Sequence, residues 1–193
     1  MIEGEGRQIS GKAYPQVEIV PATLRDLTFI AANMRAEDWR EIACQFPEGI
    51  TRTEIAALAG QFGESWVAVS SAQPVAAFGA APLTCNVLTG WAWGTRRMRR
   101  AVPAITRFMR EDCAPRWVDA GITRLEARSI AGHDEAHKWM RALGADEQPC
   151  PEWGRDGEDF ILFSWTKERQ WKPMTVKRAR TDRITWRGSF GMT

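Results

Sequence analysis

The sequence lacks the features that define several common protein classes. It has one tyrosine, Tyr14, against ten tryptophans, and only two histidines. It contains no run of about 20 apolar residues, which a membrane-spanning helix requires. Residues 1–11 contain glycine and glutamate instead of the apolar stretch of a signal peptide. We therefore expect neither a membrane span nor a secretory leader.

The four cysteines show no spacing that marks a disulfide framework, a metal site or a nucleophile. Cys44, Cys85, Cys113 and Cys150 are scattered along the chain, and none has an adjacent histidine. Small domains that depend on disulfides are much denser in cysteine. We expect reduced thiols that serve as packing groups.

The formal net charge of +2 hides an uneven distribution. Residues 167–193 carry eight Lys or Arg and two Asp or Glu, whereas the preceding 166 residues carry 18 basic and 22 acidic side chains. The basic tail has only isolated apolar residues, so it cannot bury a core of its own. A mildly acidic body with a basic tail favours a tail that contacts a partner.

The hydrophobic pattern predicts one domain over residues 16–166, between an N-terminal arm at 1–15 and a C-terminal arm at 167–193. Period-two runs predict strands, and runs of period 3.6 predict helices. The expected strands are 17–21, 65–70, 75–82, 87–95, 122–129 and 159–165, and the expected helices are 24–39, 51–63, 99–119 and 134–143. This order predicts an α/β (α+β) fold, a mixed sheet flanked by helices.

Local signals define several of these elements. Thr51 stands three residues before Glu54, the spacing of a capping box at a helix start. Trp91 and Trp93 should share one face of a strand. The helix 24–39 should break near Ala36, and the helix 99–119 should be interrupted near Pro103, unless that proline lies in its first turn, and near Pro115. Residues 146–157 are predicted to form a loop.

The segment from His133 to Ala145 carries the clearest family signal. Its apolar residues recur at helical spacing, and Gly144 stands where a helix takes its left-handed stop. Together with the preceding run Arg124-Leu125-Glu126-Ala127-Arg128, it resembles the second half of the GCN5-related N-acetyltransferase fold. Residues 17–26 resemble the first strand and helix of that fold. The resemblance covers about residues 16–166 and implies a possible acetyl-CoA enzyme.

A second set of segments carries a narrower resemblance: Asn33-Met34-Arg35 with Asp38 and Glu41, Val75–Gly79, Trp91–Thr95, Ala136 to Gly144, and Gly157 with Phe160 and Phe163. In this order they resemble acetyltransferase-like internal virion proteins of short-tailed (T7-like) bacteriophages. The resemblance implies a virion building block, in the internal core or the head–tail region, made in the host cytoplasm.

The turn after the strand 87–95 departs from the acetyltransferase pattern. Working members place glycines there, so that backbone N–H groups can approach the cofactor pyrophosphate. Here residues 95–101 contain no glycine. Thr95, Arg96, Arg97 and Arg99 are the candidate cofactor contacts, through side chains. The alternative, which we favour, is that Arg96, Arg97, Arg99 and Arg100 form a solvated or partner-binding patch, and that no cofactor is bound.

Candidate catalytic groups are scarce. The superfamily often uses a tyrosine in the last helix as its general acid. In this chain the position that resembles it is occupied by Trp139, which has no titratable proton. Glu111, Asp112 and Glu126 could each act as a base, but a surface acid is the simpler interpretation. His133 and His137 have the i, i+4 spacing of zinc ligands, yet no third ligand is evident. We favour a pair at the helix start or on the surface, and we predict no metal site.

Our first hypothesis is a virion assembly protein on a non-catalytic acetyltransferase-like fold, in a symmetric multi-subunit assembly with other virion proteins. Tryptophan and arginine are the preferred anchors of protein interfaces. An active N-acetyltransferase using acetyl-CoA is the alternative. Contact between the tail and phage DNA is a second alternative. The anchors expected in the tail are Trp171, Arg178, Arg180, Arg183 and Trp186.

Overall fold

A computed structural model describes residues 17–168 of the chain. The strands are β1 (Val17–Pro21), β2 (Glu64–Ser70), β3 (Gln73–Pro82), β4 (Val87–Gly94), β5 (Arg124–Ile130), β6 (Asp146–Cys150) and β7 (Phe160–Thr166). The helices are α1 (Leu24–Ala32), α2 (Ala36–Ala43), α3 (Arg52–Gln61), α4 (Val102–Phe108), α5 (Ala114–Asp119) and α6 (Asp134–Ala142), with a 3₁₀ turn η1 (Met98–Arg100) and a π-helical turn η2 (Met109–Cys113). The predicted α/β fold, a mixed sheet flanked by helices, is confirmed.

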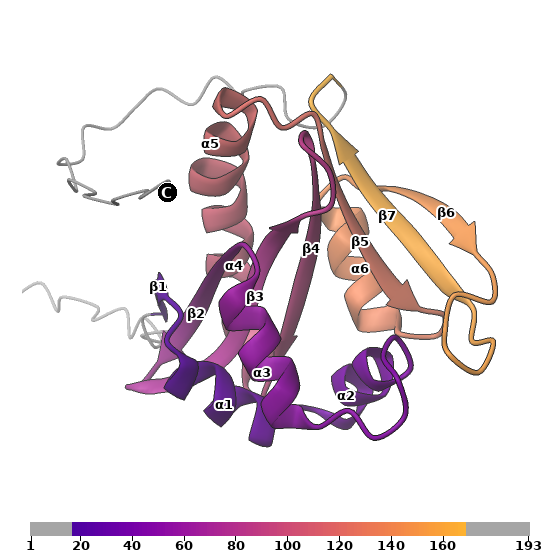
Figure 1. The fold of residues 1–193 in the computed structure, drawn as a ribbon. Helices are drawn as coiled ribbons and strands as arrows, with labels where there is room; N and C mark the ends of the chain where they lie inside the picture. The colour runs from indigo at the N-terminus through magenta and orange to yellow at the C-terminus, as the bar shows by residue number, and fades with distance from the viewer. Residues whose placement is uncertain (1–16, 169–193) are drawn as a thin grey trace, which may run out of the picture.

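The seven strands form one sheet in the order β1-β2-β3-β4-β5-β7-β6. Every neighbouring pair is antiparallel except β4 and β5, which run parallel. That parallel pair is short, because only Val87, Leu88 and Thr89 pair with residues of β5, the last pair being Thr89 and Glu126. Beyond this point the two strands separate toward their C-terminal ends (Figure 1). The sheet is therefore split into two halves at its centre.

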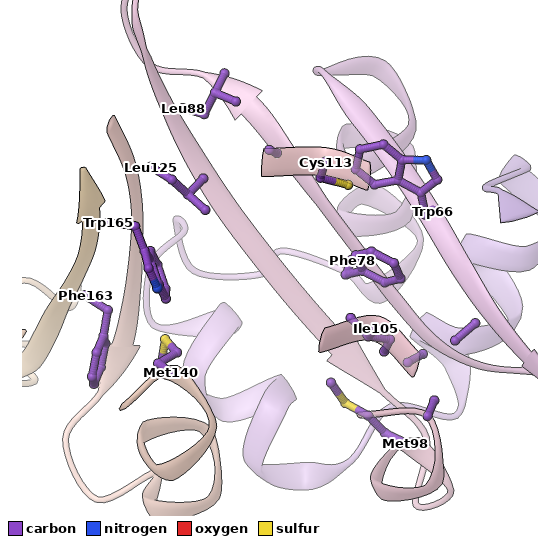
Figure 2. Close-up of a cluster of buried hydrophobic side chains, with 14 of the residues drawn as sticks. Trp66, Phe78, Leu88, Met98, Ile105, Cys113, Leu125, Met140, Phe163 and Trp165 are labelled. Carbon is purple, nitrogen blue, oxygen red and sulfur yellow. The ribbon is translucent and has the colours of Figure 1, made fainter. Parts of the chain in front are cut away.

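Helices cover both faces of the sheet (Figure 1). On one face α1 and α3 pack over β2 to β4, in a cluster that includes Leu27, Ile55 and Trp93. On the other face, α4, α5 and α6 cover a larger cluster. In Figure 2, Phe78 and Ile105 lie on the β4 side of this cluster, and Met140, Phe163 and Trp165 lie on the β5 side. Each half of the split sheet thus has its own buried side chains.

Several local predictions are confirmed. The capping box of Thr51 and Glu54 begins α3, and a second one, formed by Thr23 and Asp26, begins α1. The first helical segment breaks as expected, with α2 beginning at Ala36. The Trp91 and Trp93 rings stack 5.6 Å apart on one face of β4.

One prediction about secondary structure is confirmed in its alternative form, and another needs correction. The helix predicted over 99–119 starts late, at Val102 in α4, so Pro103 lies in its first turn, where its missing N–H costs nothing. It then widens into the π turn η2 just before Pro115, which lacks the N–H that an α-helical bond to Glu111 would need. Residues 146–150, predicted to be part of a loop, form β6 at the edge of the sheet, a position that tolerates Pro149.

The whole of the predicted N-terminal arm lies outside the described part of the chain, as do the tail residues Trp171, Arg178, Arg180, Arg183 and Trp186. Within residues 17–168, no helix has the length and apolar character needed to cross a membrane.

Candidate functional site

A cavity of about 880 Å³ lies where β4 and β5 separate. On the face covered by α2 and α3, its lining is rich in apolar and aromatic groups, including Phe46, Phe62 and Trp91. On the opposite face it is lined by Val102 of α4 and by Met140 of α6, among others. The cavity is therefore open to groups from both faces of the sheet, which is the kind of concave, largely apolar space that ligands occupy.

Helix α2 places two carboxylates between the separated strand ends. One of them, Glu41, accepts three hydrogen bonds at Oε2: from Ser129 Oγ at 2.6 Å, from the Ile130 backbone N–H at 3.1 Å, and from His133 Nδ1 at 2.8 Å. A carboxylate accepts but does not donate, so the proton of this pair is on Nδ1. Glu41 thus ties α2 to the C-terminal end of β5 and to the start of α6.

The other carboxylate, Asp38, ties α2 to the end of β4. It accepts a hydrogen bond from the Gly94 backbone N–H at 2.9 Å, and it pairs with both Nε and Nη2 of Arg35 at 3.0 and 2.7 Å. Asp38 is only 3 % exposed, so this two-point pairing offsets the cost of burying its charge. The hydrogen bonds that β4 and β5 no longer make to each other at this end are replaced by α2.

A third acid, Glu135 of α6, connects this network to the arginine turn. It pairs with Arg35 Nη1 at 3.2 Å and with Arg99 Nε at 3.3 Å. Both partners are cations, and Glu135 lies half exposed at the cavity lining. A polar chain therefore runs from the turn after β4 to the first turn of α6.

Most backbone N–H groups of the turn 95–101 are already bonded to groups of the turn itself or of β3. Thr95 donates to the Val75 carbonyl and Met98 to the Thr95 carbonyl, while Arg97 donates to Thr95 Oγ1. The N–H groups of Arg100 and Ala101 are likewise bonded within the turn. These donors are not free for a pyrophosphate, so an anion here would depend on side chains.

The predicted side chains of this turn are mostly in solvent. Arg96, Arg97, Arg99 and Arg100 are all exposed, Arg97 donating to Gln73 Oε1 at 2.7 Å. Of the four, only Arg99 lines the cavity. Thr95 is half-buried and its hydroxyl is engaged with the Val75 carbonyl. The four arginines thus form an exposed cationic patch beside the cavity.

Of the two positions expected for the histidine pair, the structure shows the helix start and not the surface. His133 is the residue at the N-cap of α6, but its side chain is 9 % exposed and bound to Glu41. His137 is 3 % exposed, and its Nε2 lies 3.1 Å from the Ile130 carbonyl oxygen. The His133 ring therefore ties the start of α6 to α2, and the His137 ring ties α6 to the end of β5. No metal-binding cluster of His, Cys, Asp and Glu occurs within residues 17–168.

The two histidines are perturbed in opposite directions. The hydrogen bond to Glu41 raises the pKa of His133 above 6.5, against the effect of burial. Burial lowers the pKa of His137. Because Nε2 of His133 has no partner nearer than Asp38 Oδ1, at 3.8 Å, among the described residues, the imidazole can take up or release a proton there.

A pH-dependent contribution to stability follows from His133. A raised folded-state pKa stabilises the fold fully below the unfolded value of 6.5, and this stabilisation is lost as the pH rises through the folded value. The free energy of unfolding of the wild type, relative to that of a His133→Gln variant, should therefore decrease between about pH 6 and pH 9. Urea denaturation of both proteins across this range measures it. His137 is present in both proteins, so its titration cancels in the comparison. A stability difference between wild type and variant that grows with pH would contradict a raised pKa at His133.

The remaining candidates have structural partners. Trp139 donates from Nε1 to Thr106 Oγ1 at 2.9 Å and joins α6 to α4. Burial raises the pKa of Cys113 to about 12, which makes it a poor nucleophile. Of the other cysteines, Cys44 is buried, Cys150 is partly buried and Cys85 is exposed. Glu126, expected at the surface, is largely buried between two arginines.

Sequence reasoning assigned no role to Asp38 and Glu41, although both belong to a segment quoted for its family resemblance. They lie 56 and 92 residues from their partners Gly94 and His133. Their spacing on α2 resembles an ordinary solvated helix face. Only the folded arrangement brings these groups together.

Comparison with solved structures identifies the fold. A phosphinothricin acetyltransferase of the GNAT superfamily from Sinorhizobium meliloti, in complex with AcCoA, matches 78 % of this chain and 88 % of its own, with 15 % identity and a TM-score of 0.61. The ribosomal-protein-S18-alanine N-acetyltransferase from Escherichia coli matches 84 % of this chain and all of its own, with 14 % identity and a TM-score of 0.57. Ard1 from Thermoplasma volcanium matches at 13 % identity and a TM-score of 0.58. The chain has the GCN5-related N-acetyltransferase fold.

No protein-family model and no curated protein matches the sequence. At these low identities the structural likeness concerns the fold, and it gives no support to the narrower resemblance to phage virion proteins. It does correct one expectation. We predicted no cofactor, and this prediction conflicts with the finding that a protein of this fold was solved with acetyl-CoA bound.

Proposed function

We propose that this chain is an N-acetyltransferase that takes its acetyl group from acetyl-CoA. The observation that carries the proposal is the cavity at the separation of β4 and β5, open to both faces of the sheet. A thioester at the end of a long, thin arm suits such a space. The gap between the strands admits the arm from one face of the sheet, and an amine can reach the thioester from the other face. The acetyltransferases that share the fold support this choice.

The residues of the turn 95–101 fit the phosphate end of the cofactor through charge. Most of its backbone N–H groups are already bonded to other groups of the protein, which leaves little of a backbone cradle there. Arg96, Arg97, Arg99 and Arg100 supply four cations within five residues, and guanidinium groups bind phosphate through paired hydrogen bonds. The cofactor supplies the activated acetyl group, and the chain supplies the cation patch that anchors it.

The reaction balances without any further reactant. The amine nitrogen forms a bond to the acetyl carbonyl carbon, the carbon–sulfur bond breaks, and the proton lost by nitrogen ends on the thiol product. The protein has to hold the amine in its neutral form beside the cavity. His133, which lines the cavity and has an unbonded Nε2 among the described residues, is a group that can carry this proton.

Calorimetric titration with acetyl-CoA tests the proposal, followed by a transfer assay that detects free thiol with phenylalanine, phenylalaninamide and phenethylamine as acceptors. We expect micromolar binding and release of one thiol per acetylated amine. Absence of both binding and transfer would reject an acetyltransferase and return the chain to a non-catalytic role.

A role in a phage virion stays a prediction. Its expected contacts in the tail lie outside the described residues. Quantifying this protein in purified virions is the direct test, since a structural component must be present in stoichiometric amount. A catalytic result in the assay above would not by itself decide this question.

A further inference from the structure

Arg128 is placed at the cavity by the register of the sheet. The last paired residues of β4 and β5 are Thr89 and Glu126. Two residues further along each strand come Trp91 and Arg128, and side chains two apart on a strand share a face. Trp91 and Arg128 therefore lie on the two walls of the gap, and both line the cavity.

The face that they share is the one covered by α2 and α3. Trp91 packs against the cluster beneath these helices, whereas Leu125, the neighbour of Glu126, packs in the cluster on the opposite face. The arginine turn leads from β4 into α4, on that opposite face (Figure 1). Arg128 thus belongs to the side of the cavity away from the proposed cofactor phosphates.

The guanidinium of Arg128 is held in place but incompletely paired. It stacks on the Trp153 ring at 4.3 Å and donates from Nη2 to Glu126 Oε2 at 3.2 Å. Its Nε is the one buried side-chain polar atom without a hydrogen-bond partner in residues 17–168. Glu126 is also shared with Arg124, whose Nε lies 2.6 Å from Oε1, so one carboxylate serves two cations. A largely buried arginine normally has its donors satisfied, so Arg128 has pairing capacity left for an anionic group.

The surroundings of Arg128 are apolar. Three of the large hydrophobic side chains that the described residues leave exposed, Phe62, Leu83 and Trp153, line this one cavity. Phe46 and Trp91 line it as well. Exposed apolar groups gathered around one opening mark a binding site for a ligand with a matching apolar body.

We propose that the acceptor is a free α-amino acid with a large apolar or aromatic side chain, whose carboxylate binds Arg128. This inference rests on the proposed acetyl transfer and names its substrate class. An α-amino group is carried by the carbon next to the carboxylate, so a carboxylate on Arg128 keeps the amine at the gap between β4 and β5. The side chain then lies against the apolar lining. Peptides, which lack a carboxylate beside their amino group, are poor substrates on this account.

Paired acceptors test the carboxylate directly. The wild type should acetylate phenylalanine with a kcat/KM about 30-fold above that of phenylalaninamide. This ratio is what one charge-assisted pair between the carboxylate and the Arg128 guanidinium contributes. Arg128→Gln should remove this preference, lowering the value for phenylalanine about 30-fold and changing that for the amide little. Alanine should be a poorer acceptor than phenylalanine. Equal rates for phenylalanine and its amide in the wild type would overturn the inference while leaving the acetyltransferase intact.

Arg124→Gln is the matched control, because Arg124 shares Glu126 but does not line the cavity. It should keep the preference for phenylalanine, and a loss equal to that of Arg128→Gln would overturn the inference. If acetyl-CoA neither binds nor reacts, the proposed function fails and the carboxylate site is judged by calorimetry with N-acetylphenylalanine. Tighter binding of N-acetylphenylalanine than of N-acetylphenylalaninamide supports the site if Arg128→Gln abolishes the difference. Equal binding of the two compounds, or no binding of either, overturns it.

Discussion

Replacing Glu41 with alanine is expected to lower the free energy of unfolding by about 3 kcal/mol, because three donors at the end of β5 and the start of α6 lose their shared acceptor. Those donors are Ser129 Oγ, the Ile130 N–H and His133 Nδ1. Urea denaturation at neutral pH measures the change. Glu41→Gln keeps an acceptor oxygen and should lose about half as much.

Glu37→Ala provides the control for this prediction. Glu37 lies on the same helix but is exposed, so its substitution tests helix propensity and net charge without the network. It should change stability by less than about 0.5 kcal/mol. If the two alanine variants are equally stable, the carboxylate of Glu41 does not hold the two halves of the sheet as described.

Removing charge from the arginine turn should weaken acetyl-CoA binding strongly. We expect an Arg96→Gln, Arg100→Gln double variant to raise the dissociation constant about 30-fold, since each exposed guanidinium–phosphate contact contributes about 1 kcal/mol. Both side chains are exposed, so the fold should be unaffected. Calorimetric titration measures the affinity, and the effect should shrink at high salt because exposed charges are screened.

The double variant Arg25→Gln, Arg40→Gln separates a local contact from a change in net charge. These two arginines are equally exposed but lie on α1 and α2, on the other face of the sheet. Their removal should leave the affinity within about twofold. If both double variants lose affinity to the same extent, the turn 95–101 is not the phosphate site.

The sequence was informative where the signal is local. The Thr51 and Glu54 pair, the alternation of Trp91 and Trp93, and the helical spacing before Gly144 each depend on a few neighbouring residues, and each feature is present in the fold. Edge strand β6 escaped prediction because Asp146-Glu147-Gln148-Pro149-Cys150 has no apolar alternation and contains a proline. Pairing with the apolar strand β7 holds it in place.

The site could not be predicted because its groups meet only in the folded chain. Arg124, Glu126 and Arg128 alternate along β5 as a solvated strand face would, and nothing local shows that Arg128 reaches a gap. That gap depends on where β4 and β5 stop pairing. The i, i+4 spacing of His133 and His137 shows only that they share a helix face. It does not show their partners, which are the distant Glu41 and the carbonyl at the end of β5.

The composition of β6 has a consequence for how the molecule behaves among its own copies. An outermost strand offers unpaired backbone groups to any passing strand, which is a common route to edge-to-edge aggregation. Here that border carries Asp146, Glu147 and a proline that has no N–H to give. Pro149 interrupts the ladder that an added strand would need, and the polar side chains, including Glu147 paired with Arg141, favour contact with water. The chemistry of this border therefore opposes its extension by further strands.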